Sequence, residues 1–261
     1  MLLSHLMEQL NFLLFRELNN MSKKEPALRA TFRHNVKNSK LIYNDSTVIL
    51  LISPGQEYHE GEKFAATIDL INRSGFKECL IIIGDTNYRH TLKIIDASSD
   101  DVLYLKAQEV GEQWLTRNYK FLGQLQMNYK ITRWASWFAH PTYEEHRKTV
   151  DYFYEHDLKF REAFLKSANE FVARIMERQN MIVSYEEAIN ASLEYLKEEC
   201  AIIMPVWAEL GFNIIIYPSN MLEAMEKTYE TIVKPNMGDH LIWLPLRFKR
   251  KTERVLEEQR N

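Results

Sequence analysis

The sequence predicts an α/β protein built on a Rossmann-like parallel sheet of about five strands flanked by helices. Apolar runs without polar alternation occupy residues 47–52, 78–84 and 213–217, which is typical of strands buried on both faces. Between the first two runs, a helical pattern begins near Glu60 and ends at Gly75. A strand, a helix and a second strand in this order form a βαβ unit, which implies parallel strands joined by a right-handed crossover.

The remaining elements are mostly helical. In chain order, we expect a long helical tract over residues 101–133, helices over 143–178, a helix from the capping box at Ser184 and Glu187, a helix over 221–232, a last strand over 241–244 and a basic tail over 246–254. Because no repeat or low-complexity linker interrupts the chain, we divide it into an N-terminal helical extension, 1–45, and a single Rossmann-like domain, 46–261. The extension begins with an amphipathic pattern that suits docking on the body or on a second subunit, so both a monomer and a homodimer remain open.

Composition restricts the possible partners. A net charge of −3 means that nucleic-acid binding requires a local basic patch. Cys79 and Cys200 stand in apolar surroundings without metal-ligand spacing, and we expect buried free thiols in a cytoplasmic protein that uses neither a metal nor a cofactor. No apolar run approaches the roughly 20 residues of a membrane span, so we expect no membrane partner.

Ser53 is the first candidate for chemistry. It follows the apolar run of the first strand, and a hydroxyl at the carboxyl end of a buried parallel strand lies where open α/β sheets bind ligands. A serine hydrolase would place Gly-x-Ser-x-Gly here, but Leu51 replaces the first glycine. Pro54 also has no backbone N–H to give to an oxyanion hole. A hydrolase triad is therefore disfavoured, and the alternative is that Ser53 only forms a turn.

Tyr195 and Glu199 form a second candidate pair. Their i, i+4 spacing places both on one face of a helix. A phenol beside a carboxylate is able to hold an ammonium group and to move its protons. The alternative is an ordinary amphipathic edge, with Glu199 in solvent beside Glu198.

Tyr217 ends the third apolar run and precedes Pro218. Because parallel strands bring their carboxyl ends to one rim, we expect Ser53 and Tyr217 to face the same cleft. The alternative is a strand that is simply ended by proline.

Taken together, these residues resemble the tRNA-dependent cyclodipeptide synthases. The family pattern is Ser-Pro after the first strand, Tyr-x-x-x-Glu on a later helix and a tyrosine after a following strand. One subfamily has Asn three residues after the serine and Tyr-His later, whereas the other has a different residue and Tyr-Pro. The corresponding residues here are Ser53, Pro54, Tyr195, Glu199, Tyr217, Gln56 and Pro218, and they match the second subfamily. The resemblance covers roughly residues 46–244, with Leu51 standing where the family usually has glycine.

The resemblance implies a catalytic domain like that of class I tyrosyl- and tryptophanyl-tRNA synthetases. It implies two aminoacyl-tRNAs as sequential substrates and a cyclic dipeptide, or diketopiperazine, as the product of a ping-pong reaction. Ser53 would carry the first aminoacyl group, Tyr195 and Glu199 would hold its amine, and Tyr217 would relay a proton or orient the reacting groups. Gln56 and Pro218 would contact substrate.

For tRNA binding, the resemblance places a basic patch on the helix near residues 117–133. The candidates are Arg117, Lys120, Lys130 and Arg133. Tyr119 stands where related proteins often have another basic residue. The basic tail ranks second, with Arg247, Lys249, Arg250, Lys251 and Arg254. Two other functions stay open, namely a serine acyltransferase or esterase acting on small esters, and a non-catalytic module that binds tRNA or protein.

Overall fold

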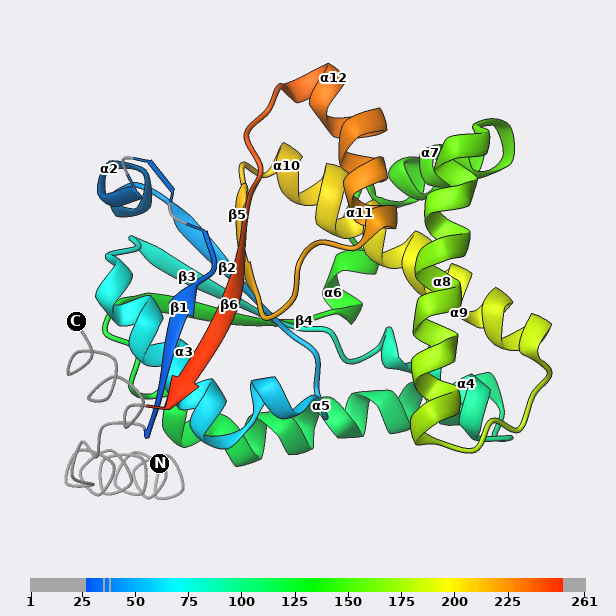
Figure 1. Cartoon of the computed structure of the whole chain (residues 1–261), viewed down its shortest axis with the longest axis horizontal. Coiled ribbons are helices and arrows are strands. Elements are labelled where there is room, and N and C mark those ends of the chain that lie inside the picture. The colour runs from blue at the N-terminus through cyan, green and yellow to red at the C-terminus, as the bar shows by residue number, and fades with distance from the viewer. Residues whose placement is uncertain (1–26, 35, 38, 251–261) are drawn as a thin grey trace, which may run out of the picture.

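A six-stranded, mostly parallel sheet forms the centre of the computed structural model, which describes residues 27–34, 36–37 and 39–250 (Figure 1). The strands are β1 (Leu28–Phe32), β2 (Thr47–Ile52), β3 (Glu78–Ile83), β4 (Asn128–Arg133), β5 (Ile214–Tyr217) and β6 (Ile242–Arg250). Their order is β1-β6-β5-β2-β3-β4, and only β1 runs antiparallel to its neighbour. The predicted parallel α/β class is confirmed, with one antiparallel edge strand added.

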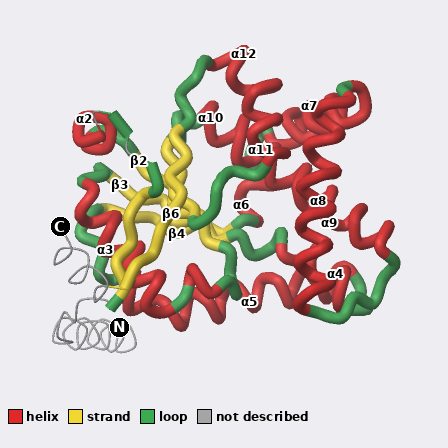
Figure 2. The backbone as a smooth tube through the Cα atoms, viewed as in Figure 1, coloured by secondary structure: helices red, strands yellow, loops and turns green. Residues whose placement is uncertain are grey.

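Helices cover both faces of this sheet (Figure 2). They are α2 (Ser39–Asn44), α3 (Gly61–Ser74), α4 (Tyr88–Ile95), α5 (Asp100–Leu122), α6 (Ala135–Phe138), α7 (Tyr143–His156), α8 (Leu158–Arg178), α9 (Tyr185–Ala201), α10 (Trp207–Glu209), α11 (Glu223–Thr228) and α12 (Lys234–Met237). A 3-10 turn covers Glu57–His59, and π-helical turns cover Ile202–Val206 and Tyr229–Val233. The predicted capping box begins α9, with Ser184 and Glu187 bonded reciprocally.

Successive residues of β2 explain the two layers. Val48 and Leu50 point into a core that includes Phe64 of α3 and Trp114 of α5. Ile49 points into the opposite core, formed with α7, α8, α9 and α11, which lie to the right of the sheet in Figure 1. Both sets are buried, so the strand needs apolar residues at every position. This requirement is the reason that the central strands could be predicted from their apolar runs.

The order of the strands places the site. From β2 the chain proceeds to β3 and β4 on one side, and then returns to β5 and β6 on the other. The direction of winding therefore reverses between β2 and β5. The carboxyl ends of two such strands border a crevice in which open α/β sheets bind ligands. Ser53 follows β2, and Tyr217 ends β5.

Three expectations about the elements are wrong. The helical tract over 101–133 ends at Leu122, and residues 128–133 form β4, an edge strand whose exposed and partly buried residues alternate at first. Part of the predicted basic tail continues β6 to Arg250. That strand pairs with β1, which lies inside the predicted helical extension. The amphipathic N-terminal segment and residues 251–261 fall outside the described residues.

The two cysteines, Cys79 and Cys200, are buried and free, as predicted. Among the described residues, none of the helices combines the length and hydropathy that crossing a lipid bilayer requires. The same residues contain no group of three or more His, Cys, Asp or Glu side chains suited to holding a metal ion.

Candidate active site

A cavity of about 350 Å³ opens at the carboxyl ends of β2 and β5. Five of the side chains singled out from the sequence line it together: Ser53, Gln56, Tyr195, Glu199 and Tyr217. Pro218 is buried and does not line the cavity, so it is not placed to touch a substrate there. Leu51 is buried at the cavity wall, where the core accommodates its side chain.

The backbone at Ser53 is held by a histidine. Gly55 adopts a left-handed conformation (φ 81°) in the turn after Ser53, and the chain then enters the 3-10 turn that carries His59. The Ser53 N–H donates to His59 Nδ1 over 2.9 Å. His59 is 1 % exposed, and burial lowers the pKa of its imidazole to about 3. The ring is therefore neutral and accepts a hydrogen bond from the backbone of Ser53.

Three hydroxyl groups form a chain that begins at Ser53. Ser53 Oγ lies 3.0 Å from the Tyr217 hydroxyl, which lies 3.1 Å from the Tyr58 hydroxyl. Burial raises the pKa of Tyr217 well above its ordinary value and also raises the pKa of Tyr58. Both phenols therefore stay protonated near neutral pH. Since a hydroxyl donates one hydrogen bond and also accepts, the chain is able to pass a proton to or from Ser53.

Tyr195 and Glu199 form the second polar group of the cavity. The Tyr195 hydroxyl donates to Glu199 Oε1 over 3.1 Å. Glu199 is only 7 % exposed, so the alternative of a solvated glutamate at an amphipathic edge is wrong. Burial raises the pKa of Glu199 to about 7, although the hydrogen bond from Tyr195 opposes the rise. A carboxyl group with such a pKa is suited to exchange protons with an amine near neutral pH.

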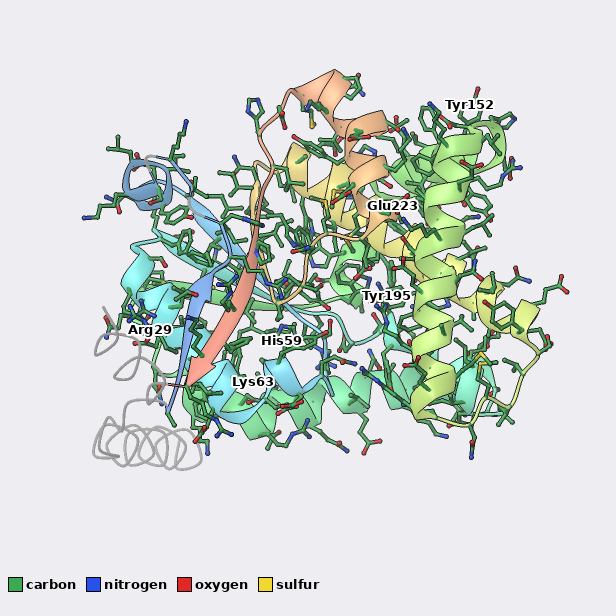
Figure 3. All side chains as sticks on the ribbon, in the orientation of Figure 1. Arg29, His59, Lys63, Tyr152, Tyr195 and Glu223 are labelled. Carbon is green, nitrogen blue, oxygen red and sulfur yellow. The ribbon has the colours of Figure 1, made fainter. Side chains whose placement is uncertain are left out.

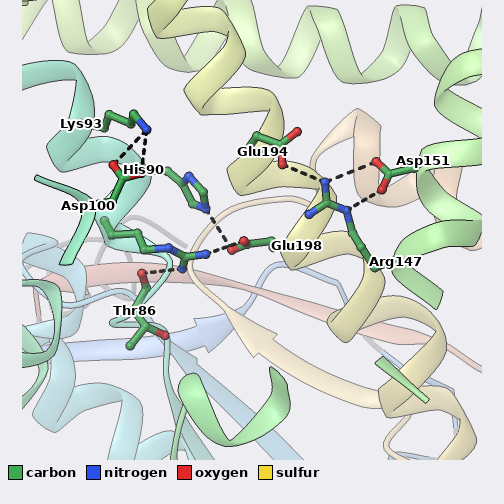
Figure 4. A network of polar contacts seen from close by, with 9 residues as sticks. Thr86, His90, Lys93, Asp100, Arg147, Asp151, Glu194 and Glu198 are labelled. Carbon is green, nitrogen blue, oxygen red and sulfur yellow. Dashed lines mark hydrogen bonds and ion pairs between the residues drawn. The ribbon is translucent and has the colours of Figure 1, made fainter. Parts of the chain in front are cut away.

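Ion pairs on both sides hold α9 in place. Glu198 accepts hydrogen bonds from Arg89 and His90 of α4, with His90 Nε2 3.0 Å from Glu198 Oε2. Arg147 of α7 donates to Glu194 over 2.8 Å, as Figure 4 shows. These contacts tie α9 to two neighbouring helices. They keep the cavity-facing side of α9, with Tyr195, directed toward the middle of the molecule, where Figure 3 also shows His59.

Comparison with known proteins decides the family. No protein-family model matches the sequence, and no curated protein matches it. A solved cyclodipeptide synthase (CDPS) from Fluoribacter dumoffii is 36 % identical in sequence to this chain. The similarity covers 85 % of this chain and 98 % of that chain, with a TM-score of 0.79. The chain belongs to the cyclodipeptide synthase family. It is therefore an enzyme, an aminoacyltransferase, as the sequence motifs predicted.

More distant structures share the fold. The cyclodipeptide synthase from Candidatus Glomeribacter gigasporarum bound to Phe-tRNAPhe is 22 % identical and covers 77 % of this chain and 87 % of its own, with a TM-score of 0.63. The tyrosyl-tRNA synthetase from Archaeoglobus fulgidus complexed with L-tyrosine is 12 % identical, with a TM-score of 0.50 over 80 % of this chain and 57 % of that chain. The likeness to a class I synthetase fold that the motifs implied is confirmed at the level of the fold.

The four basic residues predicted to bind tRNA lie on two elements of this cyclodipeptide synthase. Lys120 is exposed near the end of α5, and Arg117 of the same helix donates to Glu60 over 2.8 Å. Lys130 is exposed on β4. Arg133 ends β4 and is half-buried, with its guanidinium paired with Asp85 and Glu112. The prediction that all four residues lie on one helix is therefore wrong, and tRNA binding by these residues remains a prediction.

Arg133 has a structural role within the synthase fold. Its guanidinium pairs with Asp85, which follows β3 and is fully buried, and with Glu112 of α5. Gly111 allows α5 to approach this ion pair, because a Cβ at that position would lie 2.6 Å from Asp85 Oδ2 and 2.8 Å from Arg133 Nη2. The pair therefore ties the end of β4 to the loop after β3.

Sequence reasoning missed Tyr58 and His59, which follow the Ser53 turn so closely that their nearness along the chain was a usable signal. It also missed Arg174 and Arg178 of α8, both of which line the cavity. Nothing in the local sequence marks these two arginines, because the position of α8 at the cavity depends on its packing against α9, α11 and α7.

Proposed function

We propose that this chain condenses the aminoacyl groups of two aminoacyl-tRNAs into a cyclic dipeptide, by way of an aminoacyl ester on Ser53. The observation that carries the proposal is that one cavity brings together Ser53 Oγ, the Tyr217 hydroxyl 3.0 Å from it, and the hydrogen-bonded pair of Tyr195 and Glu199. The cavity thus offers a nucleophile, a proton path and a group that accepts a proton from an amine.

In the first half-reaction, Ser53 Oγ attacks the ester carbonyl of the first aminoacyl-tRNA. The new bond joins Oγ to the carbonyl carbon, and the bond to the terminal ribose oxygen breaks. The serine proton leaves through the hydroxyls of Tyr217 and Tyr58 and restores the ribose hydroxyl. An aminoacyl ester is already activated, so this exchange requires neither a nucleotide nor a metal.

In the second half-reaction, the α-ammonium group of the bound residue gives a proton to Glu199, with Tyr195 orienting the carboxylate. The free amine attacks the ester carbonyl of the second aminoacyl-tRNA, the bond to the terminal ribose oxygen of that tRNA breaks, and the proton that the amine nitrogen loses restores the ribose hydroxyl. A dipeptidyl ester remains on Ser53, and the second tRNA leaves deacylated. The amine of the second residue then attacks that ester, and the six-membered ring closes. The bond from the carbonyl carbon to Ser53 Oγ breaks, and Oγ takes a proton from Tyr217. The proton that the attacking amine loses replaces it on the hydroxyl chain.

The position of His59 weakens the alternative of a serine esterase. The imidazole faces the backbone N–H of Ser53, over 2.9 Å, and its pKa of about 3 makes it a poor base. Pro54 adds no N–H for an oxyanion hole. A hydrolase would place a general base and an oxyanion-hole N–H around its serine. Here the imidazole of His59 is engaged with the backbone, and Pro54 has no N–H to offer.

Gln56 and Pro218 support assignment to the subfamily with Tyr-Pro. Gln56 lines the cavity three residues after Ser53, where the other subfamily has asparagine. Pro218 directly follows Tyr217 and is buried outside the cavity lining, so it matches the subfamily pattern without touching substrate. The relative from Candidatus Glomeribacter gigasporarum that was solved with Phe-tRNAPhe supports aminoacyl-tRNA as the substrate class.

The proposal is tested by mass spectrometry of bacterial cultures that express the chain. Cyclic dipeptides should accumulate with the wild-type chain and be absent with Ser53→Ala, whose folding is checked by circular dichroism. Two results would contradict the proposal. Turnover of small esters without tRNA would point to an esterase, and tRNA binding with no cyclic dipeptide would point to a binding module.

A further inference from the structure

Two arginines at the cavity lack the carboxylate partner that five other arginines of the described chain have. Arg174 and Arg178 stand one helical turn apart on α8, are exposed and line the cavity that holds Ser53. Among the described residues, neither has a carboxylate within ion-pair distance, and Arg174 only lies over the ring of Phe171. By contrast, carboxylates pair with Arg73, Arg89, Arg117, Arg133 and Arg147.

The charges of the cavity are separated. Glu199 is the only acidic side chain among the described residues that line it, and it is buried. The two guanidinium groups are exposed, yet both lie near enough to Tyr58 to oppose the rise in its pKa that burial causes. The cavity is therefore acidic at its buried end and cationic at its rim.

We propose that Arg174 and Arg178 bind the phosphodiester groups at the 3′ end of the tRNA whose aminoacyl group lies beside Ser53. This inference rests on the proposed function. An aminoacyl-tRNA carries an amine at its tip, no free carboxylate at the ester, and phosphates one nucleotide behind the ester. That order matches an acidic interior and a cationic rim, and paired guanidinium groups are suited to phosphate oxygens.

Interaction with the helix dipole is the ordinary explanation for cations at a helix end, and it accounts for only one of the two arginines. Arg178 is the last residue of α8, where a cation complements the helix dipole. Arg174 lies one turn inside the helix and gains much less from that effect. Gln179 extends the polar rim on the same side of the cavity. The dipole therefore explains Arg178 alone, whereas a polyanionic ligand explains the pair.

The test combines a change in the protein with a change in the RNA. The protein variant is Arg174→Gln with Arg178→Gln, and the RNA change removes the terminal CCA nucleotides of a deacylated tRNA. The matched control is Lys148→Gln with Lys159→Gln, which removes the same charge from exposed positions on α7 and α8 outside the cavity lining. Affinities are measured by fluorescence anisotropy over a range of salt concentrations, with thermal unfolding as the check on folding.

For intact tRNA, the arginine variant should bind roughly tenfold or more weakly. Its log–log salt slope should flatten by about 0.7 for each single-strand phosphate contact that is lost. For tRNA without its CCA end, the arginine variant and the wild type should bind alike, because the same contacts are already missing. The lysine control should follow the wild type with both RNAs.

Additive effects of the two changes would overturn the inference, since the arginines would then not contact the 3′ end. A third RNA, the same tRNA charged with an acidic amino acid, separates the remaining explanation. If the arginine variant loses affinity only for that charged tRNA, the inference is also overturned, because the pair would then recognise a side-chain carboxylate. Absence of tRNA binding by the wild type would do the same. Failure of the proposed function is seen separately, as absence of an aminoacyl group on wild-type Ser53 after incubation with aminoacyl-tRNA.

Discussion

Replacing Glu199 by glutamine should stabilise the fold at high pH while it removes activity. Burial raises the pKa of Glu199 from 4.5 to about 7, so the folded protein binds this proton more tightly than the unfolded chain does. The stability that the raised pKa contributes is fully present below about pH 4.5 and is lost as the pH rises through about 7. At 1.36 kcal/mol per pKa unit, the loss amounts to about 3 kcal/mol. Glutamine is neutral throughout and keeps an oxygen for the Tyr195 hydroxyl.

Urea unfolding followed by tryptophan fluorescence from pH 5 to pH 9 measures this effect. Glu199→Gln should exceed the wild type by under about 1 kcal/mol at pH 5 and by up to about 3 kcal/mol at pH 9. Glu162→Gln on α8 is the matched control, because that glutamate is exposed; it should keep the wild-type pH dependence. Cyclic dipeptide formation by the wild type should rise through about pH 7 and be mostly lost in Glu199→Gln. Parallel stability curves for the wild type and Glu199→Gln would refute the reasoning.

Three further predictions address the hydroxyl chain, the core and the RNA surface. Tyr58→Phe should raise the activation free energy for acylation of Ser53 by about 0.5–1.5 kcal/mol. The acylation rate is measured by rapid quench, and an unchanged rate would exclude Tyr58 from the proton path. Gly111→Ala should lower the free energy of unfolding by about 1–3 kcal/mol, whereas Gly123→Ala, whose Cβ would lie 3.8 Å from its nearest neighbour, should not. Equal free energies of unfolding for the two variants would show that the ion pair beside Gly111 moves aside. Charge reversal at Arg117 and Lys120 should weaken tRNA binding and flatten its salt dependence; if neither changes, the tRNA approaches by another face.

The central strands and two of the catalytic candidates could be predicted because burial leaves a strong mark on the sequence. Val48 to Ile52 are all apolar because both faces of β2 are covered. The positions of Ser53 and Tyr217 then follow from topology, since Ser53 follows β2 and Tyr217 ends β5, which runs parallel beside it. The distance of 3.0 Å between Ser53 Oγ and the Tyr217 hydroxyl agrees with that reasoning.

β4 and the far half of β6 could not be predicted in the same way. In β4, Lys130 is exposed while Ile131 is partly buried, and so short an alternation in a basic segment is easily taken for helix. In β6, Arg247 and Arg250 suggested a solvated tail. β4 is an edge strand, and residues 247–250 of β6 extend past β5 and pair only with β1. Strand segments with no partner on one side carry charge, so composition alone does not distinguish them from exposed helices or tails.

The polar surroundings of the nucleophile also exceeded what the sequence could show. The buried state of Glu199 depends on how α9 packs against its neighbours, with Glu198 turned away toward Arg89. Helical spacing predicted that Tyr195 and Glu199 share a face, but it did not predict which face is buried. The raised pKa of Glu199, on which the proposed chemistry depends, is therefore a property of tertiary packing.

Detection of the acyl-enzyme tests the central claim most directly. The wild-type protein is mixed with a single kind of aminoacyl-tRNA, quenched in acid and digested with trypsin, and the peptide of residues 41–63, which contains Ser53, is weighed by mass spectrometry. One aminoacyl mass should appear on Ser53 within a turnover and disappear as cyclic dipeptide forms. Formation of cyclic dipeptide by folded Ser53→Ala, or by the wild type with no adduct at any time, would contradict the account.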